Sequence, residues 1–539
     1  MAWVLLPDEN AGQDKRVESA SVPCLDAGST PASSTQMCSN RGALTRGFLS
    51  RTECSNDYCQ GNFRLPYTPQ ISNHIVMKRF FFLGMMAVMM MPSCQSVPSS
   101  NEPSTPTDTV APVDTVTPPD TIPYRPVALK KQVTHVQPMN GMVLWNDMAA
   151  SKNSTHGACI SLEFAYIPPC KVVTGKSGNS LQYDWSYLDS KLAAAASRGH
   201  QMVLRFPLCY PSNRENCIGT KGATYVPDYI RALDNYHETY ASNPGGDGPT
   251  YYPDWSNAEL QWFVKQFYAD LATRYATDAR IAFLEVGFGH WGEYHTYGTN
   301  VNFGTNFPTK AYQRELFVHL SQVMPIPWLV SIDAGDDVYS DVFTNAQTKS
   351  LAFGLFDDSF MHAEHDISQG DGWNEQCWRL CGLNRWKLGV CGGEISYYSS
   401  NDQRSFLNPD GMYGVTWEQA ATKYHMSWII CNDAPSGSYF TPARVTEAGI
   451  ASGYRFRITA CETNSVNSRI VVKNTGVAPI YRDAYITVNG VRASESLCGL
   501  LPGEQKTFDI RNAVATSENV TITSDFILTS QQIQFDADL

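Results

Sequence analysis

The chain has 539 residues, of which 43% are hydrophobic and 12% aromatic, and its formal net charge at pH 7 is −12. A chain of this length has room for roughly two or three domains and for a large hydrophobic core. The acidic balance, with no basic stripe along the sequence, argues against nucleic acid and anionic membrane surfaces as partners.

A signal sequence is predicted well inside the chain. A Met-Lys-Arg triplet at 77–79 precedes an uncharged, mostly apolar run at 80–91, which is followed by Pro-Ser-Cys ending at Cys94. This order is typical of a signal peptide, and the run is shorter than the roughly 20 residues that span a bilayer. A cysteine at the cleavage point resembles the lipobox of bacterial lipoproteins. We therefore expect a lipoprotein signal peptide at 77–94 and a lipid anchor on Cys94 that holds an exported protein at the bacterial cell envelope, on the outer membrane or cell surface. A buried helix is the alternative.

Two further segments are expected to lie outside the folded core. Residues 1–76 carry no clear periodicity and are interpreted as sequence translated from an early start codon, the alternative being an extra domain. Residues 95–130 are rich in Pro, Thr, Ser and Asp and contain a degenerate Thr-Asp-Thr-Val repeat. Such a composition predicts a disordered, extended linker.

Between residues 131 and 449, short apolar strands alternate with helices. Three helices have clear apolar faces, with Asp184 as the expected N-cap of the first and a capping box at Ser256 and Glu259 for the second. The expected strands are 142–145, 160–164, 201–206, 281–286, 328–333, 351–356, 388–391 and 427–431. Alternation predicts a parallel sheet, and eight such units predict a closed (β/α)8 barrel, or TIM barrel, within the α/β class. An open doubly wound sheet is the alternative, but no glycine-rich phosphate loop follows the first strand.

The pattern changes over residues 450–539. Tyr454, Phe456 and Ile458 alternate with polar residues, and Asn489-Gly490 is a strong hairpin turn. These features predict a small all-β sandwich as an accessory domain. Ten cysteines follow Cys94, an even number that permits disulfides in an exported chain, but the sequence leaves the pairing open.

Two glutamates follow strands on opposite sides of the predicted barrel. Active sites of such barrels lie at the C-terminal ends of the strands. The fourth strand runs into a glycine-rich segment that ends at Glu293, and the seventh runs into Gly-Gly-Glu ending at Glu394. Glycoside cleavage needs one carboxyl group to protonate the departing oxygen and another to attack the sugar or activate water. We therefore predict Glu293 and Glu394 as a catalytic pair. Acids that cap helices or bind structural ions are the alternative, and Glu285, in mid-strand, is interpreted as a buried, hydrogen-bonded residue.

Other side chains near the strand ends are expected to bind substrate. Polar ones would bind hydroxyl groups or tune the acids, since a neighbouring carboxylate can raise the pKa of a proton donor. Aromatic ones would serve as sugar platforms, with core packing as the alternative; Tyr297, Trp373 and Tyr397 are further candidates of this kind. The predicted substrate-binding residues are Arg205, Trp291, Tyr294, His295, Asp333, Asp357, Asp358 and Trp428. A polar cluster at His362, Glu364, His365 and Asp366 matches no defined metal motif, and we expect neither a metal nor a cofactor.

Three of these segments resemble a bacterial barrel family known as domain of unknown function 4832. Members carry Trp-Gly-Glu-aromatic-His after strand four, an acidic turn after strand six and Gly-Gly-Glu after strand seven. The matching segments are 291–295, 356–360 and 392–394, and the resemblance covers roughly residues 138–435. It implies a glycoside-hydrolase barrel.

The strand-four stretch at 285–293 is also similar to the β-amylase segment that bears its catalytic acid, which implies Glu293 rather than Glu285 as the proton donor. We therefore expect hydrolysis of glycosidic bonds in a poly- or oligosaccharide, with Glu293 as the acid and Glu394 as nucleophile or base. One alternative is a non-catalytic glycan-binding lipoprotein at the cell surface. Another is a barrel lyase or isomerase, which would need a metal or a Lys or Tyr base.

Overall fold

The computed structural model describes residues 122–211, 224–242, 248–296, 299–363, 372–431 and 434–539. The predicted signal peptide, the lipid anchor on Cys94 and residues 1–76 lie outside these ranges, as does most of the polar cluster that begins at His362. Within the described ranges, no helix combines the length and the apolar character needed to cross a membrane.

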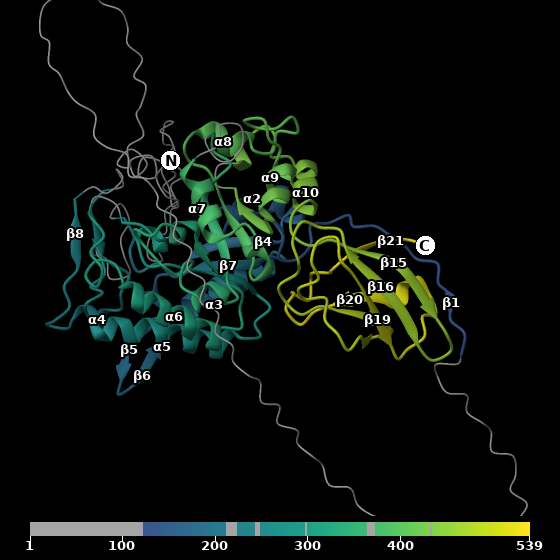
Figure 1. Cartoon of the computed structure of the whole chain (residues 1–539), viewed down its shortest axis with the longest axis horizontal. Coiled ribbons are helices and arrows are strands. Elements are labelled where there is room, and N and C mark those ends of the chain that lie inside the picture. The colour runs from purple at the N-terminus through teal and green to yellow at the C-terminus, as the bar shows by residue number, and fades with distance from the viewer. Residues whose placement is uncertain (1–121, 212–223, 243–247, 297–298, 364–371, 432–433) are drawn as a thin grey trace, which may run out of the picture. The chain divides into compact units, whose positions relative to one another are not determined.

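Eight parallel strands close into a barrel, and this confirms the predicted (β/α)8 fold (Figure 1). Around the barrel the strands are β3 (Gly141–Trp145), β4 (Leu162–Tyr166), β7 (Gln201–Arg205), β10 (Ile281–Val286), β11 (Trp328–Ser331), β12 (Gly354–Phe360), β13 (Cys391–Ile395) and β14 (Trp428–Ile430).

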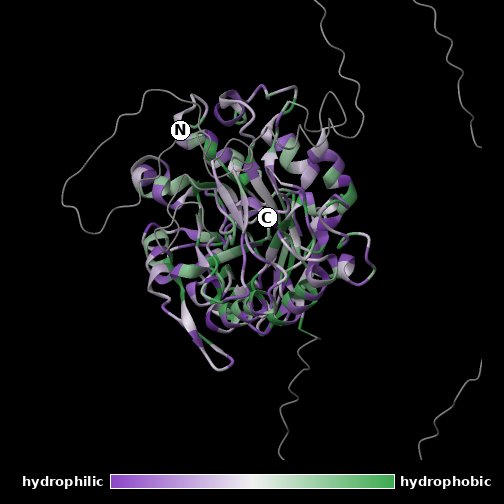
Figure 2. Cartoon of the chain, turned by 90° about the vertical axis from the view of Figure 1, so that its left-hand side faces the viewer, coloured by the Kyte–Doolittle hydropathy of each residue, from purple (hydrophilic) through white to green (hydrophobic). Residues whose placement is uncertain are grey.

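Amphipathic helices surround the barrel, and their ribbons carry both hydrophobic and hydrophilic colours (Figure 2). The connection from β11 to β12 contains only 3-10 turns, at Ile332–Gly335 and Thr348–Ser350. The helices are α2 (Asn146–His156), α3 (Ser186–Ser197), α4 (Asp228–Arg231), α5 (Ala258–Tyr275), α6 (Lys310–Val323), α7 (Trp373–Cys381), α8 (Ser400–Ser405), α9 (Trp417–Tyr424) and α10 (Pro442–Ile450).

The predicted cap of α5 is wrong by one residue. The side chain of Asn257, rather than Ser256, accepts hydrogen bonds from the backbone N–H groups of Glu259 and Leu260, at 2.9 and 3.2 Å. The Ser256 hydroxyl instead donates to Asp254 at 2.6 Å. Asparagine is as good an N-cap as serine, so the shift by one residue keeps the helix capped.

Two barrel strands lie further along the chain than predicted. β12 extends to Phe360, and β13 begins only at Cys391, so Asp357, Asp358 and Glu394 lie within strands and not after them. Gly354 explains part of this register, because a Cβ there would lie 1.8 Å from the carbonyl oxygen of Val390. The close backbone approach at this glycine allows the two strands to pair from Leu355 and Cys391 onwards.

The C-terminal region forms the predicted β-sandwich. One sheet contains β19 (Gln505–Ile510), β16 (Ser468–Asn474), β15 (Phe456–Thr463), β21 (Phe535–Asp538), β2 (Lys130–Lys131) and β1 (Arg125–Pro126), and the other contains β18 (Val491–Arg492), β17 (Tyr485–Val488) and β20 (Val520–Thr523). Asn489 and Gly490 have φ of 49° and 82°, as a tight hairpin turn requires.

The predicted linker of 95–130 is too long at its C-terminal end. β1 pairs with β15, and β2 pairs with β21, so these residues belong to the sandwich. Val127 and Leu129 are buried in the sandwich, and the burial of these apolar side chains favours the docking of this segment. Composition alone did not reveal this.

The cysteines of the described chain are mostly reduced. Cys170 forms a disulfide, whereas Cys159, Cys209, Cys377 and Cys381 are free thiols. Cys159 is therefore not bridged to Cys170, and Cys377 is not bridged to Cys381.

The barrel and the sandwich share one hydrophobic core. A single cluster of buried residues includes Phe283 and Trp428 from inside the barrel together with Phe456 and Ile486 from the sandwich. The buried Arg482 guanidinium donates to the carbonyl oxygens of Ile281 and Pro325, at 3.4 and 3.2 Å. These carbonyls lie at or just before the N-terminal ends of β10 and β11, so this contact is at the end opposite to the expected active site.

Because the core is shared, we expect the barrel and sandwich to unfold in one cooperative transition. Arg482→Met should lower the free energy of unfolding by roughly 1–3 kcal/mol, since it leaves buried carbonyls without a donor, and should keep the transition single. Differential scanning calorimetry with a comparison of calorimetric and van't Hoff enthalpies checks this. Two separate transitions would contradict a common core.

Candidate active site

The barrel interior changes from apolar to charged along its strands. Side chains two residues apart on a strand share a face. Val203 and Phe283 belong to the buried apolar cluster, and two residues further along their strands lie Arg205 and Glu285, both fully buried. Phe356 and Asp358 repeat the change on β12. A charged layer therefore lies above an apolar layer, towards the C-terminal ends of the strands.

The segment after β10 folds back over the end of its own strand. The backbone N–H groups of Phe288 and Gly289 both donate to the carbonyl oxygen of Glu293, at 3.0 and 2.7 Å. Trp291 and Gly292 turn the chain through left-handed conformations, with φ of 53° and 80°. This turn aims the Glu293 side chain back at the barrel axis.

Two glycines make this fold-back sterically possible. A Cβ at Gly287 would lie 2.0 Å from the carbonyl oxygen of Gly292, and one at Gly289 would lie 2.0 Å from that of His295. No real side chain tolerates such contacts, so these positions require glycine. The glycine-rich sequence before Glu293 is thus the local cause of its placement.

The Arg205 guanidinium joins three buried glutamates. Its Nε donates to Glu285 at 2.6 Å, its Nη1 to Glu293 at 2.6 Å and its Nη2 to Glu394 at 3.3 Å. Since the guanidinium is small and planar, the bonded oxygens of Glu293 and Glu394 lie no more than about 8 Å apart. The structure therefore brings together the two predicted glutamates, and it bears out the interpretation of Glu285 as buried and hydrogen-bonded.

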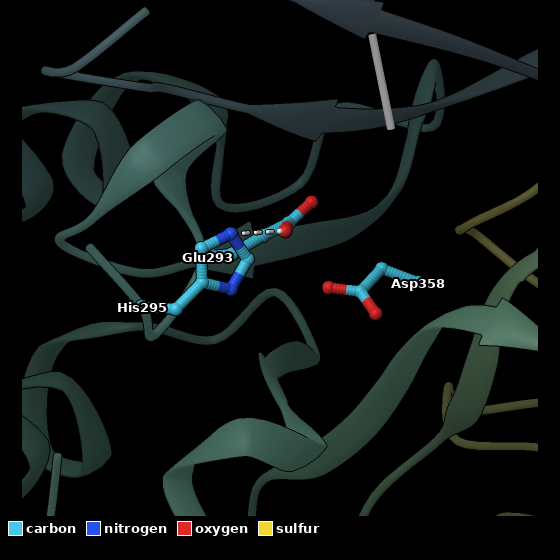
Figure 3. A group of neighbouring side chains, drawn as sticks. All are labelled: Glu293, His295 and Asp358. Carbon is cyan, nitrogen blue, oxygen red and sulfur yellow. Dashed lines mark ion pairs between the residues drawn. The ribbon is translucent and has the colours of Figure 1, made fainter. Parts of the chain in front are cut away.

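His295 lies between Asp333 and Glu293. Its Nδ1 is 2.6 Å from Oδ2 of Asp333, and its Nε2 is 3.3 Å from Oε2 of Glu293. Figure 3 shows the imidazole beside the Glu293 carboxyl, with the Asp358 carboxyl pointing towards the pair. All four side chains are at most 3% exposed.

Glu293, His295 and Asp358 also offer the ligand types that hold a divalent cation, with atoms within 4.8 Å of one another. The guanidinium of Arg205, 2.6 Å from Glu293, would repel a second cation bound to that carboxyl.

The buried carboxyl groups outnumber the cations beside them, which keeps protons on some of them. Burial and the charge of Asp358 raise the pKa of Glu293 well above its usual value, against the opposing effect of Arg205. Burial raises the pKa of Glu394 to about 8 and that of Asp358 to about 6. Burial also lowers the pKa of His295 to about 4, so the ring is neutral near pH 7.

Three of the predicted substrate-binding residues are placed elsewhere. Tyr294 is fully buried between helices and barrel, with its ring 5.4 Å from that of Phe288. Trp428 lies in the apolar layer, 6.3 Å from the ring of Phe283, where the lack of a side chain at Gly392 makes room for it. Both predictions of a sugar platform are therefore wrong, because the core-packing alternative applies.

Asp357 is the third predicted substrate-binding residue that lies outside the site. Its side chain accepts hydrogen bonds from Asn374 and from the Trp378 indole, both at 2.7 Å, and so anchors α7 to the barrel. Alternation along β12 directs it to the opposite face from Asp358. Trp291 packs with Tyr210 and Tyr225 beside the site and is 1% exposed.

Two tyrosines contribute polar contacts. Arg205 Nη1 donates to the Tyr166 hydroxyl at 3.2 Å, and the Tyr397 hydroxyl donates to Glu394 at 3.3 Å. Tyr397 was expected only as a platform, and Tyr166 was not predicted. The sequence did contain a signal for Tyr166, because it follows Phe164 by two residues and so lies on the same face of the strand. Of the polar cluster after β12, only His362 is described; it is buried, with its ring 4.7 Å from that of Tyr398.

No family model and no curated protein sequence matches the chain, so membership in the family of domain of unknown function 4832 stays a prediction. Similar solved structures include the catalytic domain of β-amylase from Paenibacillus polymyxa, which is 12% identical, with 56% of this chain and 92% of that chain covered and a TM-score of 0.35. An intracellular xylanase from Thermoanaerobacterium saccharolyticum is 9% identical, with 54% and 84% covered and a TM-score of 0.31. A β-xylosidase from Caulobacter crescentus is 10% identical, with 67% and 83% covered and a TM-score of 0.32. The function proposed below rests on the side chains of the site.

Arg205→Met should destabilise the protein strongly, because it leaves three buried glutamates without their cation. Removing one partner of a buried ion pair costs roughly 3–5 kcal/mol. Urea unfolding at pH 8 measures the change, and the loss should shrink at pH 5, where the carboxyl groups are protonated. Arg274→Met, which removes an exposed pair with Asp189, is the matched control and should change stability little. Equal effects of the two substitutions would contradict the role of Arg205.

Proposed function

We propose that this protein hydrolyses glycosidic bonds of a poly- or oligosaccharide, with Glu293 as general acid and Glu394 as nucleophile or general base. The observation that carries the proposal is the pair of buried glutamates bonded to one guanidinium at the C-terminal part of the barrel. Glycoside cleavage requires two carboxyl groups that can reach the same bond.

The two glutamates have different neighbours. Burial and the Asp358 carboxyl raise the pKa of Glu293 and so favour its acid form. Burial also raises the pKa of Glu394, to about 8, but Arg205 and the Tyr397 hydroxyl favour its ionised form. We therefore assign Glu293 as the acid and Glu394 as the group that ionises.

The reaction follows from these states. Glu293 gives its proton to the glycosidic oxygen as the bond from that oxygen to the anomeric carbon breaks. The Glu394 carboxylate either attacks the anomeric carbon or removes a proton from the water that attacks it. The upper limit of about 8 Å on the oxygen separation accommodates both the retaining and the inverting geometry.

We also infer that the protein acts at the cell envelope as a lipoprotein. The support is the basic-apolar-Cys pattern at 77–94, together with the spacer composition that follows Cys94.

Glu293→Gln should lower kcat/KM by about 10²–10⁴ on glycosides with poor leaving groups, because these need protonation. Aryl glycosides with an acidic phenol should lose much less, whereas Glu394→Gln should abolish turnover of both. A glycan panel followed by steady-state kinetics on the substrates it identifies provides the measurement.

Glu163→Gln is the control, since Glu163 is a buried glutamate paired with Arg198 away from the site. It should leave the leaving-group dependence unchanged. Glycan binding without turnover in the wild type would contradict hydrolysis and indicate a glycan-binding protein.

The pH profile tests the assignment of Glu394. The groups facing it are Arg205 and Tyr397, which lower its pKa, and Glu285 and Asp358, which raise it. Because Glu394 must ionise, kcat/KM should rise with pH with a midpoint displaced from that of an ordinary glutamate towards about 8. A midpoint near that of an exposed carboxyl would contradict the assignment.

The same raised pKa predicts a stability effect. A carboxyl that binds its proton more tightly when folded disfavours folding increasingly as pH rises from its unfolded pKa to its folded pKa. Glu394→Gln should therefore raise the melting temperature more at pH 8 than at pH 5, as measured by calorimetry. A smaller gain at pH 8 would show that the Glu394 carboxyl is stabilised as the anion.

A further inference from the structure

We propose that Asp333, His295 and Glu293 form a proton relay, in which the neutral imidazole passes protons between the two carboxyl groups and so loads Glu293 for general-acid catalysis. The catalytic part of this relay rests on the proposed function, because it takes Glu293 as the acid. The distribution of protons among these three side chains can be measured without substrate.

The geometry places one ring nitrogen on each carboxyl group. Nδ1 of His295 lies 2.6 Å from Asp333 and Nε2 lies 3.3 Å from Glu293. Local hydrogen bonds hold the backbone of His295 and Asp333 in place. The His290 N–H donates to the His295 carbonyl at 2.9 Å, and the Asp333 N–H donates to the Ser331 hydroxyl at 3.2 Å. The ring therefore lies between two partners from the segments that follow β10 and β11.

A neutral ring has one N–H and can carry it on either nitrogen. Burial lowers the pKa of His295 to about 4, which keeps the ring neutral across the working range. Asp333 and Glu293 contact the ring directly, and Asp358 and Arg205 act on its charge with opposite effects. Both ring tautomers are thus compatible with the site.

The proton transfer balances with no net change in charge. In the unloaded state Asp333 is a carboxylic acid that donates to Nδ1, and Nε2–H donates to the Glu293 carboxylate. Loading moves the Asp333 proton to Nδ1 and the Nε2 proton to Oε2 of Glu293. Asp333 becomes the carboxylate, Glu293 becomes the acid, and the imidazole has changed only its tautomer.

Both ends of the relay favour the acid form. Burial and Asp358 raise the pKa of Glu293 well above its usual value, although the Arg205 guanidinium on Oε1 opposes this. Burial and the charges of Asp357 and Asp336 raise the pKa of Asp333 well above its usual value. Once Glu293 has given its proton to a substrate oxygen, the Asp333 proton is available to reload it through the ring.

Asp333→Asn tests the relay by a change of few atoms. An asparagine N–H donates to Nδ1 but cannot release its proton, so it locks the ring with Nε2–H towards Glu293 and keeps that carboxyl unloaded. We expect a loss of about 10²–10⁴ in kcat on poor leaving groups and a much smaller loss on aryl glycosides with acidic phenols. His295→Gln should give the same selective loss. A purely structural role would lower both rates alike.

His200→Gln is the matched control, because His200 is a buried histidine whose Nδ1 lies 2.7 Å from Glu163, outside the site. It should leave the leaving-group dependence at the wild-type value. Asp333→Asn with wild-type rates on poor leaving groups, in an enzyme where Glu293→Gln is impaired, would overturn the relay while leaving the proposed function intact.

Nitrogen-15 NMR of histidine-labelled protein provides the readout that needs no activity, and so remains decisive if the wild type hydrolyses nothing. In the wild type we expect a neutral His295 ring whose two nitrogen shifts lie between the protonated and unprotonated limits. In Asp333→Asn the ring should be fixed as the Nε2–H tautomer. A charged ring in the wild type, or the same tautomer in both proteins, would overturn the relay.

Discussion

The buried guanidinium of Arg205 is the interaction on which the site depends. It is held by three glutamates from β10, from the segment after β10 and from β13. Without it, carboxyl groups of like charge would share a volume from which water is excluded, and ionisation of more than one would be strongly unfavourable. With it, some ionise and others keep protons, and this mixed state is the one that acid–base chemistry uses.

The residues that stabilise the fold and the residues of the candidate site lie at different levels along the barrel axis. The sandwich and the apolar layer share one core, and the buried contact of Arg482 is made at the N-terminal ends of the strands. The charged layer lies two residues further along β7, β10 and β12. The cost of burying charge is thus offset by a continuous apolar core below it, and catalytic residues of such barrels commonly lie at the C-terminal end.

The glycines around Glu293 show how backbone geometry determines side-chain chemistry. Gly287 and Gly289 allow the chain to cross its own strand end at distances that exclude a Cβ. The fold-back brings His295 against Asp333, which lies in the turn after the next strand, β11. An acid, an imidazole and a second acid are then in contact, because one turn after β10 supplies two of the three.

Local sequence determined which segments form strands and that Glu293 follows β10, because alternation and glycine patterns act over a few residues. The bounds of β12 and β13, which include Asp358 and Glu394, came only from the pairing of the strands. Local sequence also predicted the (β/α)8 barrel, the sandwich and the Asn489-Gly490 turn. Only the tertiary structure decided which candidates face the axis, since a shift of one residue reverses the face of a side chain. That is why Asp357 anchors a helix while Asp358 enters the site, and why Trp428 is core. The hub at Arg205 joins residues up to 189 positions apart, a pairing that long-range packing sets and that no local pattern encodes.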